Sequence, residues 1–156
     1  MRVHICAVGR LRAGPESALI DDYLTRFERS GRNLGLTFGG VHEVEDKKGG
    51  GKPAEALLLG RVIPENARII ALDERGKVLT SPRFSDRLAT DRDAGCSDLA
   101  FVIGGADGLA PDLLARADMT LSFGAMVWPH MLARVMLCEQ LYRAASILAG
   151  SPYHRV

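Results

Sequence analysis

The chain of 156 residues fits a single domain, over 1–156, which can bury a hydrophobic core without disulfides or metal ions. Its 47% apolar and 25% charged residues are ordinary for a soluble globular protein, and with a formal net charge of +1 any nucleic-acid partner must be bound through a local basic patch. The three cysteines have no metal-ligand spacing, and no apolar run approaches the roughly 18 residues of a membrane span. We therefore expect a cytoplasmic protein without a disulfide, a metal ion or a membrane partner.

Strand-like and helix-like segments alternate along the chain. A strand is expected at 2–8, and a helix follows from Pro15, because proline is tolerated in a first helical turn, to Gly31. The later expected elements are a strand within 34–44 interrupted by two glycines, a helix over 53–64, a strand over 68–73, a helix from 81 toward 94, a strand over 98–105, a short helix from 111, a strand over 119–123 and a helix over about 129–149. This alternation predicts an α/β fold with a largely parallel sheet covered on both faces.

The predicted last helix is apolar nearly all round. Its only formal charges are Arg134, Glu139 and Arg143. Such a helix must be buried on more than one face. We expect one face to pack on the protomer's own sheet and another on a second copy of the chain.

A charged, glycine-rich loop is predicted at 45–53. Its lysines Lys47, Lys48 and Lys52 suit a phosphate backbone, although the composition favours a solvated flexible loop. The loop is not a P-loop, because Pro53 stands where a Ser or Thr is required and Asp46 stands where the leading glycine should be.

Three loops follow predicted strands and should meet at the carboxyl edge of the sheet, where α/β proteins bind ligands. They are 72–73, 104–108 and 123–129. The glycines of 104–108 allow either close backbone approach to a ligand or a tight turn. The loop 123–129 is unusually apolar, and its Trp128 either stacks on a base or fills the core, of which core filling is favoured.

The end of the chain carries an unusual combination of side chains. Tyr153, His154 and Arg155 offer an aromatic ring, an imidazole and a guanidinium within three residues. These groups can stack on a base, exchange a proton near neutral pH and contact phosphate.

Three motifs together resemble one known family. They are IGGADG at 103–108, WPHMLARVMLCEQLYRA at 128–144 and YHR at 153–155. The chain is similar, over essentially its full length, to the RlmH family of 23S rRNA pseudouridine-N3 methyltransferases in the SPOUT superfamily.

The resemblance implies an α/β knot fold with a C-terminal trefoil knot, a homodimer, and S-adenosyl-L-methionine bound in the knot. A knot is a rare exception to ordinary chain topology, and periodicity does not indicate it. Carried over by position, the implied cofactor contacts are Leu72, Gly104, Gly105, Gly124, Ala125, Met126, Val127, Trp128 and Pro129.

The resemblance also implies a substrate, a pseudouridine in the helix 69 stem-loop of 23S rRNA, methylated at N3 on the assembled 70S ribosome. Tyr153, His154 and Arg155 match the family's catalytic and substrate-side residues, with His154 as the proton acceptor or a substrate-orienting group. His130 and Arg134 are further substrate candidates, and Arg10, Arg12, Lys47, Lys48 and Lys52 are candidate phosphate contacts.

Two other functions stay open on the residues alone. One is a ribosome-assembly or RNA-binding module that keeps the fold without catalysis. The other is a flavodoxin-like nucleotide or flavin binder, which the strand–helix alternation permits.

Overall fold

The computed structural model describes residues 1–155, so the last residue of the predicted domain, Val156, lies outside the described residues. The elements are β1 (Arg2–Val8), α1 (Pro15–Gly31), a short 3-10 helix (Arg32–Leu34), β2 (Thr37–Val44), α2 (Gly51–Val62), β3 (Arg68–Val78), α3 (Ser81–Asp93), β4 (Asp98–Ile103), α4 (Pro111–Arg116), β5 (Met119–Ser122) and α5 (His130–Leu148). The strands form one sheet in the order β2-β1-β4-β3-β5, and all four pairings are parallel. The predicted α/β class and parallel sheet are confirmed.

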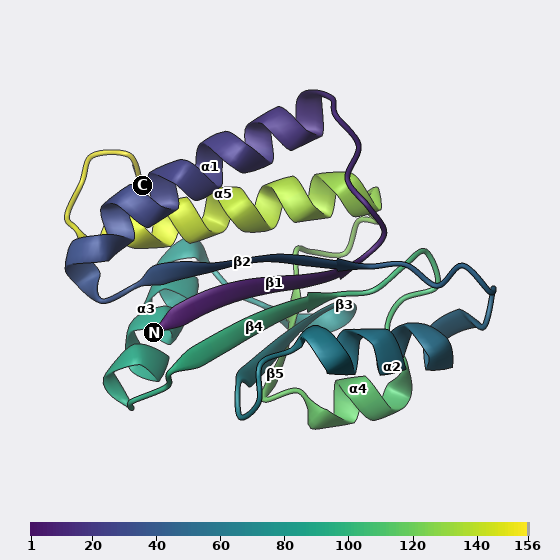
Figure 1. Ribbon diagram of the computed structural model, residues 1–156. Helices are drawn as coiled ribbons and strands as arrows, with labels where there is room; N and C mark the ends of the chain where they lie inside the picture. Colours follow the sequence, from purple (N-terminus) through teal and green to yellow (C-terminus); the bar gives the residue numbers. More distant parts are fainter. Residues whose placement is uncertain (156) are drawn as a thin grey trace.

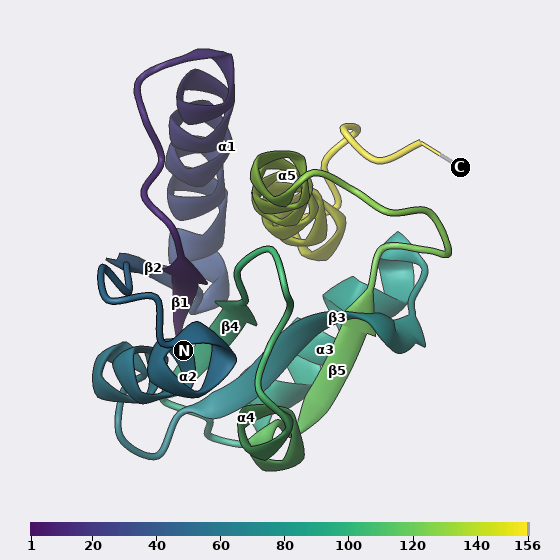
Figure 2. The same ribbon diagram turned by 90° about the vertical axis from the view of Figure 1, so that its right-hand side faces the viewer.

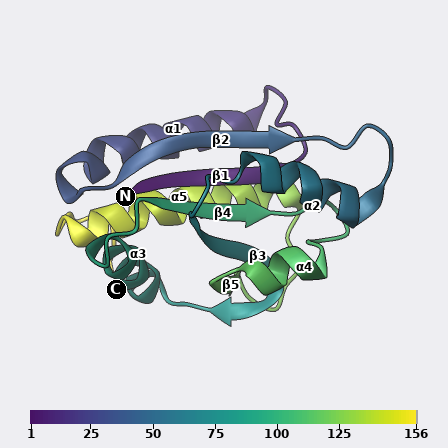
Figure 3. The same ribbon diagram turned by 60° about the horizontal axis from the view of Figure 1, so that its bottom comes forward.

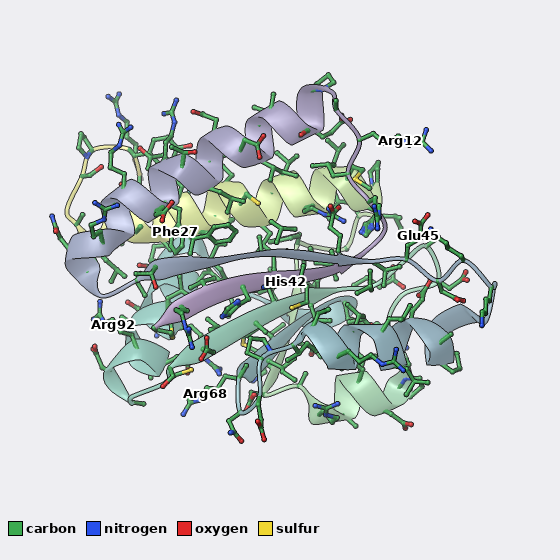
Figure 4. The ribbon with its side chains drawn as sticks, in the orientation of Figure 1. Arg12, Phe27, His42, Glu45, Arg68 and Arg92 are labelled. Carbon is green, nitrogen blue, oxygen red and sulfur yellow. The ribbon has the colours of Figure 1, made fainter. Side chains whose placement is uncertain are left out.

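The sheet is the middle of three layers. Helices α1, α3 and α5 cover one face, and α2 and α4 cover the other, as Figures 1 and 3 show. The strands bury side chains on both faces because each face has its own core: Ile5 and Phe101 pack with α1, α3 and α5, whereas Cys6 and Val102 pack with α2 and α4. Phe27 lies fully buried between α1 and the sheet (Figure 4).

Two strands differ from the prediction. The two glycines at 39–40 do not end β2, because the ladder with β1 shifts register there and continues to Val44. The prediction that β3 ends at residue 73 is wrong, since the strand runs on to Val78 and its end also pairs with β5. Gly76 permits this path, because a Cβ at that position would lie 2.7 Å from the Thr120 carbonyl carbon.

The helix starts were predicted within two residues. Helix α2 begins at Gly51 rather than Pro53, which leaves the proline in the first turn, where its missing N–H costs no hydrogen bond. The cap of α3 is Thr80, one residue before the expected Ser81, and its hydroxyl accepts a hydrogen bond from the Arg83 amide at 3.3 Å.

Helix α5 is buried by neighbours within the same chain. Its inward residues, Leu137, Cys138 and Leu141, reach the core over the sheet, and α1 and α3 flank it. These flanking helices provide part of the burial that we expected from a second copy. On its remaining side Leu132 stays 41% exposed.

Two of the three cysteines belong to the core. Cys6 and Cys138 are fully buried, and burial raises the pKa of each thiol to about 12. Such thiols stay protonated at neutral pH and are poor nucleophiles.

Candidate functional site

A cavity of about 360 Å³ opens where β4 and β5 end, beside residues 72–75 of β3, where the pairing of β3 with β5 shifts register. Its walls come from the three loops that were expected to meet at this edge, together with residues from α2 and α5. The lining residues are Lys52, Leu72, Asp73, Glu74, Arg75, Ile103, Gly104, Gly105, Ala106, Asp107, Gly108, Leu109, Leu121, Ser122, Phe123, Gly124, Met126, Val127, Trp128, His130 and Ala133. The parallel order explains the convergence, because β4, β3 and β5 are neighbours whose carboxyl ends point the same way.

Most of the predicted cofactor contacts lie in this cavity. Leu72, Gly104, Gly105, Gly124, Met126, Val127 and Trp128 line it, whereas Ala125 and Pro129 of the same apolar loop do not. The structure thus brings together residues more than 50 positions apart, and their role in holding a cofactor stays a prediction.

The glycine loop after β4 is a closed turn. The Gly108 amide donates to the Gly105 carbonyl at 3.0 Å, and a Cβ on Gly104 would lie 2.6 Å from the Gly108 carbonyl carbon. A Cβ on Gly105 would lie 3.0 Å from the Glu55 carboxylate. The loop is therefore a tight turn, and its backbone also forms part of the cavity wall, while the approach of a ligand to this backbone stays a prediction.

The apolar loop before α5 is not packed into the core. Met126 is 72% and Val127 83% exposed, and Trp128 is 40% exposed while lining the cavity. The favoured interpretation of Trp128 as a core residue is therefore wrong. Gly124 starts the loop at a φ of +114°, a conformation that favours glycine, and its amide donates to the Ser122 hydroxyl at 3.1 Å.

Charged groups at the rim were only partly foreseen. Asp73 accepts hydrogen bonds from the Arg75 amide at 2.9 Å and the Arg75 Nε at 3.1 Å, and these bonds lower the pKa of the Asp73 carboxyl. Lys52, predicted in the charged loop 45–53 and as a candidate phosphate contact, instead lies in the first turn of α2 and lines the cavity. Asp73, the acid that ends the apolar run 68–73, was the residue from which the sequence indicated a charged group here.

His130 and Arg134 lie one turn apart at the start of α5, but only His130 lines the cavity, whereas Arg134 is fully buried. The Nε2 of His130 is buried without a partner among the described residues, and burial, followed by the charge of Arg134, lowers the pKa of His130. Arg134 is 0% exposed and donates to Glu43 at 2.6 Å and to the Gly9 carbonyl at 3.1 Å. A direct contact between Arg134 and a substrate has no support in this geometry.

The tail residues lie far from the cavity within one protomer. Helix α5 separates them: it spans 19 residues, which at roughly 1.5 Å per residue is about 28 Å. Figure 1 shows the tail at the end of α5 opposite the carboxyl ends of the strands, and Figure 2 shows it leaving α5 on the side away from α1. The structure does not bring Tyr153, His154 and Arg155 together with the predicted cofactor contacts of the same chain.

The tail is held on α5 by a network that the sequence analysis missed. The Tyr153 hydroxyl donates to Glu139 at 3.0 Å, and burial, followed by this hydrogen bond, raises the pKa of Tyr153. Arg143 donates to the same carboxylate and reaches His154. Arg155 is exposed. The spacing Glu139-x3-Arg143 is typical of a helical ion pair and was the available signal.

The predicted phosphate contacts lie at the cavity edge of the sheet. Lys47 and Lys48 are exposed on the loop after β2, and Arg10, 3.8 Å from Glu45, is exposed beside them. Figure 4 shows Arg12 pointing outward from the loop between β1 and α1, at the same edge of the molecule as Glu45. The loop is compact rather than unstructured, because the Asp46 carboxylate accepts from the Lys48 and Gly50 amides at 3.1 and 2.5 Å.

Neither a membrane nor a metal site is indicated in the part of the chain that the structure describes. Among residues 1–155, no helix has both the length and the apolar character that crossing a bilayer requires. In the same residues, no three His, Cys, Asp or Glu side chains are grouped closely enough to bind a metal ion.

Comparison with known proteins identifies related chains over the full length. Residues 1–154 match the family model described as "Predicted SPOUT methyltransferase". Ribosomal RNA large subunit methyltransferase H of Dinoroseobacter shibae is 69% identical over 156 residues, and the protein of the same name from a Ruegeria species is 67% identical, each alignment covering 100% of both chains. The crystal structure of TrmJ from Z. mobilis ZM4 is similar in fold, with a TM-score of 0.52 at 16% identity, covering 97% of this chain and 71% of that one.

Proposed function

The chain belongs to the SPOUT methyltransferase family, and we propose that it transfers a methyl group from S-adenosylmethionine to N3 of a pseudouridine in 23S rRNA. Relatives that are 62–69% identical over the whole chain and carry the name ribosomal RNA large subunit methyltransferase H support an rRNA substrate. The all-parallel order β2-β1-β4-β3-β5 is consistent with the SPOUT fold and its C-terminal trefoil knot. The helix 69 stem-loop and the assembled 70S ribosome are the finer parts of the proposal.

The observation that carries the proposal is the cavity at the carboxyl ends of β4 and β5, beside residues 72–75 of β3. Its bare turn at 104–108 offers backbone groups to a polar ligand, and Leu72, Leu109 and Trp128 offer apolar surface to a flat ring such as adenine. The charged side chains that line the cavity are Asp73, Glu74 and Asp107 against Lys52 and Arg75, a small negative excess that would favour a cationic ligand. When bound, S-adenosylmethionine supplies a methyl group on a positively charged sulfur, and it leaves as a neutral thioether.

A homodimer would resolve the separation of the tail from the cavity. The groove between α1, α3 and α5 has a volume of about 500 Å³ and is bordered by the exposed side chains of Leu19 and Val78, which are 44% and 69% exposed. Met126, Val127 and Leu132 are further exposed apolar side chains, and apolar side chains gathered on a surface are typical of association sites.

The same groove links the dimer to catalysis. Glu139, which accepts the hydrogen bond of Tyr153 in the tail, lines it together with Gln140. In a two-fold arrangement of antiparallel α5 helices, each tail would lie beside the cavity of the partner, because the cavity and the tail are at opposite ends of α5. We therefore place each active site between two protomers, with the cofactor bound by one and His154 supplied by the other.

The acceptor nitrogen carries a proton that must leave before methylation. Two imidazoles can contact the acceptor base. They are His130 at the cavity wall, whose lowered pKa favours the neutral form, and His154 on the partner's tail. Arg155, exposed beside His154, can pair with a phosphate or with the developing negative charge of the base. Most of the acceleration would come from holding acceptor and methyl donor in line.

The binding of ribosomal RNA would depend on local charge. Lys47, Lys48 and Arg12 are exposed at the edge of the sheet where its strands have their carboxyl ends, and exposed Arg10 lies 3.8 Å from Glu45, while the net charge of the chain is only +1. A small basic group binds bare RNA weakly, which favours recognition of a preformed ribosomal surface.

The decisive experiment is transfer of a labelled methyl group to ribosomes that lack the modification, with the product nucleoside identified by mass. We expect N3-methylpseudouridine in the large-subunit RNA. A protein that binds ribosomes without transferring methyl groups would instead be a non-catalytic RNA-binding module. Binding of flavin in place of S-adenosylmethionine would favour the flavodoxin-like alternative.

A further inference from the structure

The Glu139 carboxylate is the centre of a fixed polar cluster. Its Oε1 accepts hydrogen bonds from Arg143 Nε at 2.9 Å, from Arg143 Nη2 at 2.5 Å and from the Tyr153 hydroxyl at 3.0 Å. Its Oε2 accepts from Gln140 Nε2 at 2.7 Å. With four donors on two oxygens, and only 17% of the side chain exposed, this carboxylate has little freedom to move.

The cluster is braced from both sides. Ser81, at the start of α3, donates to the Gln140 amide oxygen at 2.8 Å and so fixes which end of that amide faces Glu139. On the tail side, the Tyr153 ring lies 4.5 Å from the ring of Tyr142 and under the Arg143 guanidinium at 4.8 Å. Glu139 therefore holds Arg143 in one orientation, and Arg143 and Tyr142 hold the tail.

The next contact determines which nitrogen of His154 carries the proton. Arg143 Nη1 lies 3.3 Å from His154 Nδ1. A guanidinium has hydrogen-bond donors only, so the nitrogen that faces it must accept with its lone pair. A neutral imidazole that accepts at Nδ1 carries its single proton on Nε2.

We propose that Glu139 is a positioning residue that holds Arg143 against Nδ1 of His154, so that His154 presents an Nε2–H donor to the acceptor base. This inference rests on the proposed function for the identity of that base, whereas the position of the proton is a property of the chain alone. In a uracil-type ring the carbonyl oxygens beside N3 accept the N–H and share the negative charge once N3 loses its proton. His154 in this form has no free lone pair for the N3 proton, so that proton must go to another base, His130 at the cavity wall or solvent water.

The position of the proton can be measured without activity. The chain has 4 histidines, so labelling with ¹⁵N-histidine gives a short list of long-range ¹H–¹⁵N correlation patterns, and His154→Gln assigns the one that disappears. We expect the Nε2–H pattern for His154 near neutral pH in the wild type. Glu139→Gln and Arg143→Ala should convert it into a mixture of both tautomers. Glu65→Gln, in an exposed turn before β3, is the matched control and should leave it unchanged.

An Nδ1–H pattern for His154 in the wild type would overturn the inference, and so would an unchanged pattern in Glu139→Gln and Arg143→Ala.

Activity gives a second test. His154→Gln keeps an N–H donor but cannot accept a proton, so we expect it to retain methyl transfer within about 10-fold of the wild type, while His154→Leu loses roughly 100-fold or more. Equal losses in both variants would contradict the donor role. The spectrum decides the tautomer even if ribosomes are not the substrate, so failure of the proposed function and failure of this inference are distinguishable.

Discussion

The fully buried guanidinium of Arg134 lies 2.6 Å from the Glu43 carboxylate, and this pair joins the amino-terminal part of α5 to the end of β2. Glu43 also accepts from the Leu11 amide at 2.6 Å, so the same carboxylate holds the loop after β1. The start of α5, where His130 faces the cavity, thus depends on a carboxylate from the opposite edge strand of the sheet.

We expect Glu43→Ala to destabilise the fold by about 3 kcal/mol, because it leaves the Arg134 charge buried without its partner. Urea unfolding followed by circular dichroism measures this change. The matched control is Asp22→Ala, which removes an exposed carboxylate paired with Arg26 on α1 and should have a much smaller effect. Equal destabilisation in both variants would show that the buried pair has no special role.

Acid should weaken the amino-terminal edge of the sheet through Asp98. Burial alone would raise the pKa of this carboxyl, but hydrogen bonds from Arg2 and His4 outweigh it and hold the pKa below the ordinary value of 3.8. A lowered carboxyl pKa stabilises the folded state above the unfolded-state pKa, and this stabilisation is lost as the pH falls through the folded-state pKa. In Asp98→Asn, we expect the free energy of unfolding to fall less steeply below about pH 5 than in the wild type. The same pH dependence of the unfolding free energy in Asp98→Asn and in the wild type would contradict this role of Asp98.

The turn after β4 should tolerate no side chain at Gly104. We expect Gly104→Ala to lower the calorimetric affinity for S-adenosylmethionine by at least about 10-fold, because its Cβ would force the Gly108 backbone out of the turn. Gly60→Ala is the control, since a Cβ there meets nothing within 4 Å on α2. Its affinity should equal that of the wild type. Wild-type affinity in Gly104→Ala would remove this turn from the cofactor site.

Lys47 and Lys48 should contribute to ribosome binding through their charge alone. We expect Lys47→Ala/Lys48→Ala to weaken ribosome binding at low salt and to reduce the slope of log affinity against log salt by about 1.5, as for two lost phosphate contacts. Arg61→Ala/Arg116→Ala removes two exposed charges from α2 and α4 and serves as the control. A salt slope equal to that of the wild type would mean that the loop is only solvated.

Sequence patterns predicted the elements well where one local rule decides them. Proline in the first turn marked the starts of α1, α3 and α4, and the apolar run 98–105 marked β4, which ends two residues earlier at Ile103. The extension of β3 beyond residue 73 escaped prediction because the segment is polar and its pairing with β5 depends on the close approach at Gly76.

The site was predictable only in part, for a related reason. Strand ends indicated which loops meet, and the motifs indicated what they bind. The burial of Arg134 could not be foreseen, because its partner Glu43 lies 91 residues earlier. The distance between His154 and the cavity depends on the direction of α5, which no local pattern specifies.

The most direct test of the composite site is complementation between two inactive variants. His154→Leu removes the tail imidazole and keeps the cavity, whereas Gly104→Ala disrupts the cavity and keeps the tail. If each active site joins the cavity of one protomer to the tail of the other, refolding the two variants together in equal amounts should restore about a quarter of the wild-type methyl transfer, because half of the dimers are mixed and each has one intact site. Activity no greater than the sum of the separate variants would show that cavity and tail do not combine across a dimer.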